Sequence, residues 1–362
     1  MLRYGKGSSM ASEISKHLSA PVLFISDNIL RGHSMYSITG LFSRKVFLVA
    51  ILINLTALSF TSIAEQKISE SIEADPIGTV LIEHVVGKAN ISGWDKNEVS
   101  VQGTLGDRTD KVKFERNGKS VQLIIEVKNK QNWSDWSSSQ GDDLTIRVPI
   151  NSKVNYTSVN ADASISSIYG GIDAEVVNGD VNASDLKGRV RLESVNGDIR
   201  AEKISGQLKI ETVNGSIKAK QNDTKDLFLS TVNGDIDAHS DSTQINAESV
   251  NGDIELTLSK VDEAEFTTVN GAIEVSMHLN AGGDVRASSV GGSIALSFQE
   301  SIAAKFDIEA HAGGSIKNNI TNDKVEKAKY GPRRSLTFST PNPTASVDVS
   351  TVHGRVIVKT EK

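Results

Sequence analysis

Apolar and polar positions alternate along most of the chain after residue 64, and this alternation predicts short β-strands rather than helices. Between residues 177 and 273 a phrase recurs in which Val-Asn-Gly is followed by Asp, Ser or Ala and then by Val or Ile. Clear copies begin at Val177, Val195, Val213, Val232, Val250 and Val269, and weaker copies begin at Val159 and Val290. The intervals are 18, 18, 18, 19, 18, 19 and 21 residues, a period that fits one coil of a β-solenoid.

Two arrangements of strands satisfy this pattern. Asn-Gly between apolar runs favours a two-residue hairpin turn, so an antiparallel meander, sandwich or barrel is one alternative. A second turn signal lies half a period away, at Gly170, Gly188 and Gly206. In a solenoid, equivalent residues stack at about 4.8 Å, and stacking favours the same residue type in each coil. The recurrence of residue types therefore favours a single-stranded β-helix, or β-solenoid, with 18–19 residues per coil.

The solenoid interpretation predicts columns of equivalent side chains. Inward aliphatic columns are expected from Leu192, Ile210, Leu229 and Ile245, from Ile199, Ile217, Ile236, Ile254 and Ile273, and from Ala201, Ala219 and Ala238. Ser194, Thr212, Thr231, Ser249, Thr268 and Ser289 form a hydroxyl column expected to cap the turns. A structural turn ladder is expected at Asn178, Gly179, Asn196, Gly197, Asn214, Gly215, Asn233, Gly234, Asn251, Gly252, Asn270 and Gly271. Stacked amides can hydrogen-bond between coils, and glycine permits a left-handed or crowded backbone.

Residues 1–64 have the pattern of an export leader. Arg44 and Lys45 precede an apolar core at 46–60, and small residues follow it, which predicts a signal peptide cleaved after Ala64. An uncleaved membrane anchor is the alternative, although the stretch is short for a spanning helix. Met35 would begin a signal of ordinary length and is a candidate true start.

The remainder divides into three parts. Residues 65–150 are expected to form irregular β coils and an N-terminal cap, and residues 151–317 the regular solenoid repeats. Residues 318–362 are expected to form a loop and closing strands, with Val356–Val358 as the last strand of the stack. Caps are expected because the open end of a solenoid is an unpaired β-edge.

Composition agrees with a narrow β-structure. Only 5% of the 362 residues are aromatic and 29 are glycine, whereas a thick globular core normally contains more large side chains. Cysteine is absent, which excludes disulfides, thiolate metal sites and a lipid-modified N-terminal cysteine. Residues 65–362 contain 33 basic and 43 acidic side chains, which gives a net charge of −10. No nucleic-acid partner is therefore expected.

Several segments resemble one protein family. Three kinds of segment look like the bacterial DUF4097 group, a family with an adhesin label. They are Val80-Leu-Ile-Glu-His-Val-Val-Gly-Lys-Ala-Asn-Ile-Ser-Gly-Trp-Asp, the Leu144-Thr-Ile-Arg-Val-Pro step and the repeated Ser/Thr-Val-Asn-Gly-Asp-Ile phrases. The similarity covers most of residues 75–358. It implies a β-helical or β-solenoid fold in a secreted or envelope protein, and it supplies no catalytic motif. The segment containing Trp133 and Trp136 departs from the family pattern and is expected to be an insertion.

Candidate chemistry is sparse. Asp180, Asp198, Asp235 and Asp253 recur at a turn, as in a calcium-stabilised β-roll, but the equivalent positions become Ser216, Ala272 and Ser293. Polysaccharide cleavage is a second possibility because stacking brings carboxylates together, yet no compact charged group interrupts the coils. We therefore expect no catalytic residues, no cofactor and no metal site.

The sequence leads to an adhesin-like prediction. Trp133 and Trp136 lie in a polar segment and are candidate ligand contacts, with a capping role over the solenoid end as the alternative. The predicted function is a non-catalytic, exported β-solenoid of the periplasm or cell surface, acting as a structural or binding module. Its partner is expected to be an envelope or extracellular polysaccharide or a protein surface, contacted through repeated weak interactions. The alternatives are a β-helical polysaccharide lyase or hydrolase and a calcium-stabilised β-roll.

Overall fold

Parallel pairing between successive repeats is the main feature of the computed structural model, which describes residues 66–128 and 140–361. Ile199 pairs with Ile217, and the same column continues through Ile236, Ile254, Ile273 and Ile294. These residues are buried. The expected all-β, solenoid-like repeat is therefore present, and the antiparallel meander is wrong for this part of the chain, because its strands run parallel to the strands one period away.

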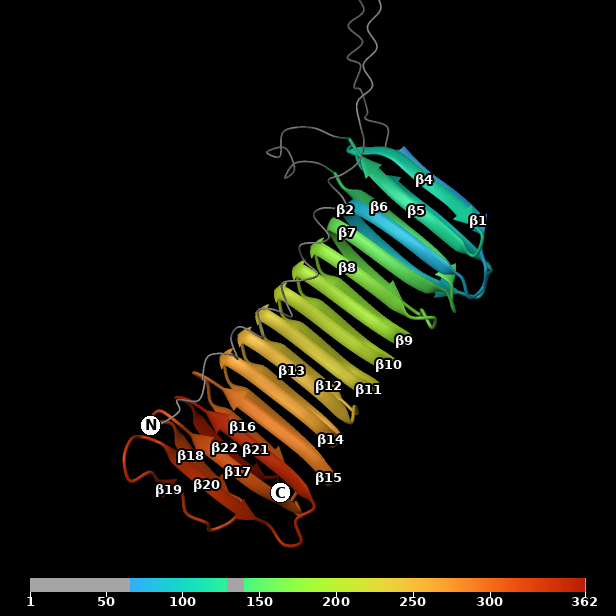
Figure 1. The fold of residues 1–362 in the computed structure, drawn as a ribbon. Coiled ribbons are helices and arrows are strands. Elements are labelled where there is room, and N and C mark those ends of the chain that lie inside the picture. Colours follow the sequence, from blue (N-terminus) through green and yellow to red (C-terminus); the bar gives the residue numbers. More distant parts are fainter. Residues whose placement is uncertain (1–65, 129–139, 362) are drawn as a thin grey trace, which may run out of the picture. The chain divides into compact units, whose positions relative to one another are not determined.

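The repeats occupy the middle of the described chain (Figure 1). Their strands are β7 (Lys153–Ser166), β8 (Ile172–Asn178), β9 (Val181–Asn196), β10 (Ile199–Asn214), β11 (Ile217–Asn233), β12 (Ile236–Ser240), β13 (Gln244–Asn251), β14 (Ile254–Asn270), β15 (Ile273–Ser289) and β16 (Ile294–Phe298). A long strand such as β10 bends near its middle at Gly206, where φ is +115°. The bend and the Asn-Gly turn divide each repeat into two pairing segments.

The alanine and hydroxyl columns form as expected. Ala201 pairs with Ala219 and Ala219 with Ala238. One aliphatic column differs: Leu192, Ile210 and Leu229 stack, but Leu229 pairs with Ala247, whereas Ile245 pairs with Leu227. The expected position of Ile245 is wrong because the place 18 residues after Leu229 in this column is held by the small Ala247. Ile245 lies two positions earlier on the same face and belongs to the neighbouring column of Val190, Leu208 and Leu227.

The N-terminal strands interleave with later ones. They are β1 (Gln66–Glu73), β2 (Thr79–Trp94), β3 (Glu98–Leu105), β4 (Thr109–Asn117), β5 (Ser120–Val127) and β6 (Asp142–Pro149). β2 lies between β7 on one edge and both β5 and β6 on the other, all parallel to it. Antiparallel pairing of β3 with β6 and of β4 with β5 then covers the end of the stack. Such cover removes the open parallel edge that would otherwise recruit another chain.

The C-terminal strands interleave in the same manner. They are β17 (Ala304–Ala310), β18 (Ser315–Asn319), β19 (Glu326–Lys327), β20 (Arg334–Ser339), β21 (Ala345–Thr351) and β22 (Arg355–Thr360). β21 pairs with both β15 and β17, and β22 pairs with both β16 and β18 (Figure 1). The expected closure of the stack by Val356–Val358 is therefore wrong. The end is covered instead by β20, antiparallel to β17, and by β19 beyond it.

A continuous apolar core runs from the N-terminal strands through the repeats to the C-terminal strands. Its small Val, Ile, Leu and Ala side chains are supplemented at the C-terminal end by three phenylalanines. The rings of Phe298 and Phe306 meet edge to face at 5.6 Å, and those of Phe306 and Phe338 stack at 4.5 Å. Because the inward positions are apolar, functional side chains are expected on the outer faces of the strands and at the turns.

Candidate functional site

The turn ladder predicted from the Asn-Gly phrases consists of hydrogen bonds between stacked repeats. Each asparagine amide donates to the side-chain oxygen of the asparagine one repeat earlier, over 2.7–2.9 Å, in the series Asn160, Asn178, Asn196, Asn214, Asn233, Asn251 and Asn270. The hydroxyl column caps the same turns: Thr212 Oγ1 donates to the Gly197 carbonyl at 3.2 Å and Thr231 Oγ1 to the Gly215 carbonyl at 3.0 Å. The ladder amides and most of the column hydroxyls thus satisfy one another, whereas the buried Thr268 Oγ1 has no hydrogen-bond partner within the described part of the chain.

The turn glycines are explained mainly by crowding. A Cβ atom on Gly215 would lie 2.0 Å from the carbonyl oxygen of Gly197, and one on Gly252 would lie 1.9 Å from that of Gly234. Only glycine allows the turns to approach this closely. The ladder residues are therefore structural.

The acidic turn residues also have a structural role. Asp180 Oδ1 accepts a hydrogen bond from the Asp198 backbone N–H at 2.9 Å, and Asp198 Oδ1 accepts one from the Ser216 N–H at 2.9 Å. Each carboxylate thus binds the backbone of the next repeat. Among the residues that the structure describes, no group of three or more His, Cys, Asp or Glu side chains could hold a metal ion. The other candidate contacts, Trp133 and Trp136, lie outside the described residues.

A separate charged cluster lies on the outer face of β8, β9, β10 and β11. The parallel register places Asp173, Arg191, Lys209 and Phe228 in one column, one from each strand. Beside it, Glu175, Glu193 and Glu211 form a second column. Arg191 lies between the columns: its guanidinium is 2.5 Å from Glu193 and 3.6 Å from both Asp173 and Glu175.

Burial and mutual repulsion shape the charges of this cluster. Burial raises the pKa of Glu193, and the adjoining Glu211 raises it further, with Arg191 acting in the opposite direction. Burial alone would lower the pKa of Arg191, but Glu193, Asp173 and Glu175 together raise it, so the guanidinium remains charged. Lys209 pairs with Glu211 at 2.9 Å. Asp173 and the three stacked glutamates thus share two cations, and Glu193 keeps its proton to a higher pH than an ordinary glutamate does.

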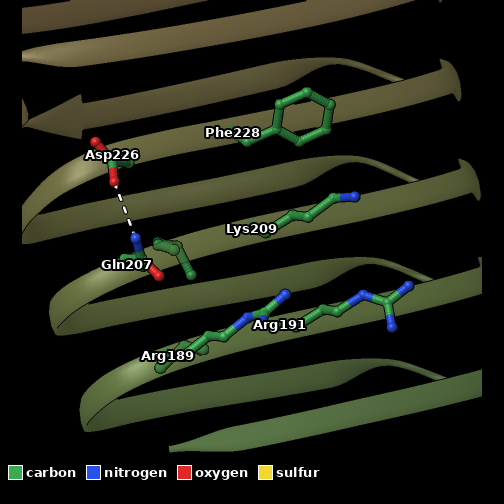
Figure 2. A pocket seen from close by; sticks show the side chains of 8 residues that line it. Arg189, Arg191, Gln207, Lys209, Asp226 and Phe228 are labelled. Atoms are coloured by element: carbon green, nitrogen blue, oxygen red, sulfur yellow. Dashed lines mark hydrogen bonds between the residues drawn. The ribbon is translucent and has the colours of Figure 1, made fainter. Parts of the chain in front are cut away.

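A shallow depression of about 200 Å³ adjoins this cluster (Figure 2). Its lining side chains come from β9, β10 and β11 and are Arg189, Val190, Arg191, Gln207, Leu208, Lys209, Asp226 and Phe228. The Lys209 ammonium lies 5.0 Å from the centre of the Phe228 ring, and Gln207 Nε2 donates to Asp226 Oδ2 at 3.1 Å. Arg189 is exposed at the rim. The depression therefore presents cationic donors, an amide and an aromatic face together, a set suited to binding polar ligands.

A second polar cluster is buried near the N-terminal end. His84 Nε2 lies 3.1 Å from Asp142 Oδ2, and His84 Nδ1 lies 3.4 Å from the Tyr156 hydroxyl. Asp142 Oδ1 also accepts hydrogen bonds of 2.6 Å from Thr109 Oγ1 and from the Gly106 N–H. Burial raises the pKa of Tyr156 to about 12. This cluster is closed to ligands and joins β2, β4, β6 and β7.

Sequence reasoning missed the depression. Its residues are not part of the recurrent phrase, and Arg189 stands out in the sequence only as the residue after the turn glycine Gly188. In the sequence, Glu193 and Glu211 are marked only by directly preceding Ser194 and Thr212 of the hydroxyl column. Placing the chain on its period does reveal the cluster, because residues 173, 191, 209 and 228 are separated by 18, 18 and 19 positions and carry acidic, basic, basic and aromatic side chains.

The chain was compared with known proteins. The family model described as Toastrack DUF4097 matches residues 88–326. Among solved structures, the chain is similar to a proposed cell adhesion protein from Clostridium sporogenes (11% identity, TM-score 0.20, covering 82% of this chain and 100% of that chain). It is also similar to a proposed adhesin from Bacteroides fragilis (14% identity, TM-score 0.33, covering 82% of this chain and 97% of that chain). A proposed lipid binding protein from Parabacteroides distasonis is similar as well (11% identity, TM-score 0.30, covering 82% of this chain and 97% of that chain). No curated protein matches it.

The family match extends from β2 to β19 and spans more than half of the chain. It includes the turn ladders, the charged cluster and the depression. The low TM-scores carry no function from the solved structures to this protein. Across residues 66–128 and 140–361, no helix has the length and apolar character needed to cross a membrane. The resemblance inferred from the recurrent phrases is confirmed by the family match, and the chain belongs to the Toastrack DUF4097 family.

Proposed function

We propose that this protein is an exported, non-catalytic, adhesin-like binding module of the bacterial cell envelope. The observation that carries the proposal is the depression on β9, β10 and β11, where Arg189, Lys209 and Phe228 from three successive strands converge. The turn ladders satisfy their own polar groups, so they contribute rigidity. The depression, in contrast, presents the exposed guanidinium group of Arg189 and the half-buried ring of Phe228, beside Lys209, which is paired with Glu211.

The chemistry of the depression favours a polysaccharide that carries acidic groups. Guanidinium and ammonium groups donate hydrogen bonds to carboxylates and hydroxyls, and a partly exposed phenylalanine can pack against the C–H face of a sugar ring. A chain-like ligand lying along the stack would cross strands spaced about 4.8 Å apart. Weak contacts of this kind gain strength when a polymer makes several at once.

Export is part of the proposal and rests on the sequence. The basic and apolar segment at 44–60, with small residues up to Ala64, has the form of a cleaved signal peptide. The absence of cysteine is compatible with an oxidising compartment. Analysis of the N-terminus of protein recovered from a periplasmic extract tests this step, and an N-terminus upstream of residue 65 would contradict cleavage after Ala64.

Polysaccharide cleavage is a second candidate, favoured by one observation. The pKa of Glu193 is raised and the Glu211 carboxyl group stacks beside it, and glycoside hydrolysis uses a carboxyl group of raised pKa together with a second carboxyl group nearby. Against this candidate, Arg191 and Lys209 already hold these two carboxylates in ion pairs. The binding module therefore remains the preferred function.

A binding screen with a built-in activity assay distinguishes the two functions. The chain from Glu65 to Lys362 would be tested against acidic and neutral envelope polysaccharides, with release of reducing or unsaturated sugar ends followed in the same wells. We expect binding of acidic polymers without release. Arg189→Ala combined with Phe228→Ala should weaken binding about tenfold or more.

The control removes two exposed cations that lie outside the depression. Lys218→Ala combined with Lys260→Ala changes exposed cations of β11 and β14 outside the depression and should bind as the parent does. Equal binding by the depression variant and the parent would overturn the assigned surface. Sugar release that Glu193→Gln abolishes would replace the binding module with an enzyme.

A further inference from the structure

The C-terminal cap carries a basic hairpin, defined here as residues 324–334, which includes β19 and the start of β20. β19 is paired antiparallel with β20 through Glu326 and Lys327, and β20 is paired with β17 (Figure 1). The turn between them is closed by a hydrogen bond of 3.0 Å from the Ala328 N–H to the Arg333 carbonyl. Gly331 adopts φ of +97° within this turn. Residues 329–332 therefore form its tip.

The tip exposes an aromatic ring. Tyr330 is 84% exposed, the highest value among the large hydrophobic side chains that the structure describes as exposed. The Lys329 ammonium lies 5.4 Å from the centre of its ring. A tyrosine that only stabilised the fold would pack its ring against the core, as Tyr156 does at 0% exposure. The exposure of Tyr330 points to a role outside the fold.

The charge of the hairpin is opposite to that of the rest of the molecule. Five basic side chains, Lys324, Lys327, Lys329, Arg333 and Arg334, accompany a single acidic one, Glu326, whereas the whole chain has a net charge of −6. The three lysines are exposed. Near a negatively charged surface, the field attracts the basic hairpin and repels the acidic remainder of the molecule. The molecule is therefore oriented with the hairpin toward that surface.

Two arginines fix the hairpin to the stack. Arg333 forms an ion pair with Glu309 on β17, and Arg334 Nη1 donates to the Gly314 carbonyl at 2.8 Å. These contacts hold the base of the hairpin in place. The lysines and Tyr330 are thereby presented at a defined end of the molecule.

We propose that the basic hairpin docks the C-terminal end of the stack onto an anionic phospholipid surface. Lysines beside a membrane are attracted to acidic headgroups within a Debye length, and tyrosine rings partition to the headgroup level because one end of the ring is apolar and the other polar. The convex tip favours this partner over a polysaccharide, because sugar chains are usually bound along grooves or flat aromatic platforms. This inference is independent of the ligand proposed for the depression.

Cosedimentation with vesicles tests the proposal. Residues from Gln66 onward form one compact unit with a continuous core, so the chain from Glu65 to Lys362 can be used, which also removes the apolar segment at 46–60. Vesicles containing phosphatidylglycerol would be compared with vesicles of phosphatidylcholine alone, at low and high salt. We expect binding to the anionic vesicles only, and weaker binding as salt increases.

Variants locate the contact. Lys327→Glu with Lys329→Glu should weaken vesicle binding about tenfold or more. Lys218→Glu with Lys260→Glu makes the same change in net charge on exposed side chains away from the hairpin and should have a much smaller effect. A Tyr330→Trp variant should show a blue shift of its fluorescence when anionic vesicles are added, because the ring enters a less polar environment.

Several results would overturn the proposal. One is equal binding by the hairpin and control variants, which would assign any attraction to the body of the molecule. Another is binding of an acidic polysaccharide through Lys327 and Lys329 without vesicle binding, which would make the partner a glycan. Circular dichroism of each variant checks that the fold is retained, as expected for exposed side chains.

Discussion

The side chain of His84 lies 3.1 Å from that of Asp142, although 58 residues separate them in sequence. Both are almost completely buried. Their contact joins β2 to β6. At this point β2 lies between β6 and β7, two strands that come later in the sequence. Asp142 also accepts hydrogen bonds from Thr109 and the Gly106 N–H, so one carboxylate holds three segments of the N-terminal end.

Asp142→Ala should destabilise the protein by about 3 kcal/mol, because it removes the shared hydrogen-bond partner of the buried His84 and Thr109 side chains and of the half-buried Gly106 N–H. Asp143→Ala is the matched control, since Asp143 is the next residue and is exposed. Urea denaturation of the two variants measures the difference. A loss for Asp142→Ala no greater than that for Asp143→Ala would show that the buried network adds nothing to stability.

The same carboxylate should make stability depend on acid pH. Burial alone would raise the pKa of Asp142, but the hydrogen bonds from His84, Thr109 and Gly106 outweigh it and leave the pKa below the ordinary value. Since the folded pKa is depressed, the stabilisation is present above the ordinary pKa of aspartate and is lost as the pH falls toward the folded value. Urea midpoints measured between pH 5 and about pH 2 should fall less steeply for Asp142→Asn than for the parent.

Glu193 should have the opposite pH dependence. Because its pKa is raised in the folded state, its contribution to stability is greatest below the ordinary value of 4.5 and declines as the pH rises toward the folded value. Glu193→Gln should therefore raise the free energy of unfolding by about 1 kcal/mol at pH 8 and have little effect near pH 4. Calorimetry at both pH values tests this, with the exposed Glu202→Gln as control. A destabilised Glu193→Gln at pH 8 would contradict it.

Two adjacent glycines should respond differently to alanine. A Cβ atom on Gly292 would lie 1.5 Å from the Gly271 carbonyl oxygen, whereas one on Gly291 would have its nearest contact at 3.3 Å. Gly292→Ala should cost about 3 kcal/mol or prevent folding, and Gly291→Ala should cost less than about 1 kcal/mol. Thermal unfolding of the pair measures the contrast, and similar midpoints would refute the crowding explanation.

The asparagine ladder should contribute measurable stability. Asn214 donates to Asn196 and accepts from Asn233, so Asn214→Ala removes two hydrogen bonds between exposed side chains. A loss of about 1 kcal/mol is expected, because exposed amides recover part of the interaction from water. Asn182→Ala, at an exposed position of β9 outside the ladder, serves as the reference in urea denaturation. Equal losses would mean that the ladder adds no net stability.

The period and the repeated columns could be read from the sequence because stacking imposes the same local requirement on every repeat. Ile199 and Ile217 occupy equivalent places in successive repeats, and Gly197 and Gly215 each lie against the carbonyl of the turn glycine one repeat earlier. The same residue type is therefore required at each of these positions. The assignment of Ile245 failed because Ala247 fills the column beside Leu229, whereas Ile245 points to the same side of the strand two positions earlier. Hydrophobicity alone favours the larger residue and does not decide between the two positions.

The ends could not be read in the same way. Three strands there, β2, β21 and β22, are paired with strands that are distant in the sequence. No periodic signal in the sequence indicates that one of these strands lies between two others. The depression also escaped prediction, because outward positions carry no packing requirement and vary from repeat to repeat. Arg191, Lys209 and Phe228 become a group only once the register is known.

The interleaving of β21 and β22 has a consequence for biosynthesis and for mechanical load. β17 and β18 cannot take their final places until residues 345–360 have left the ribosome, since those residues fill the gap between them and β15 and β16. Once inserted, β22 is hydrogen-bonded along both edges. A pulling force on it must break two parallel ladders at once, so this end of the stack should resist being peeled open one strand at a time.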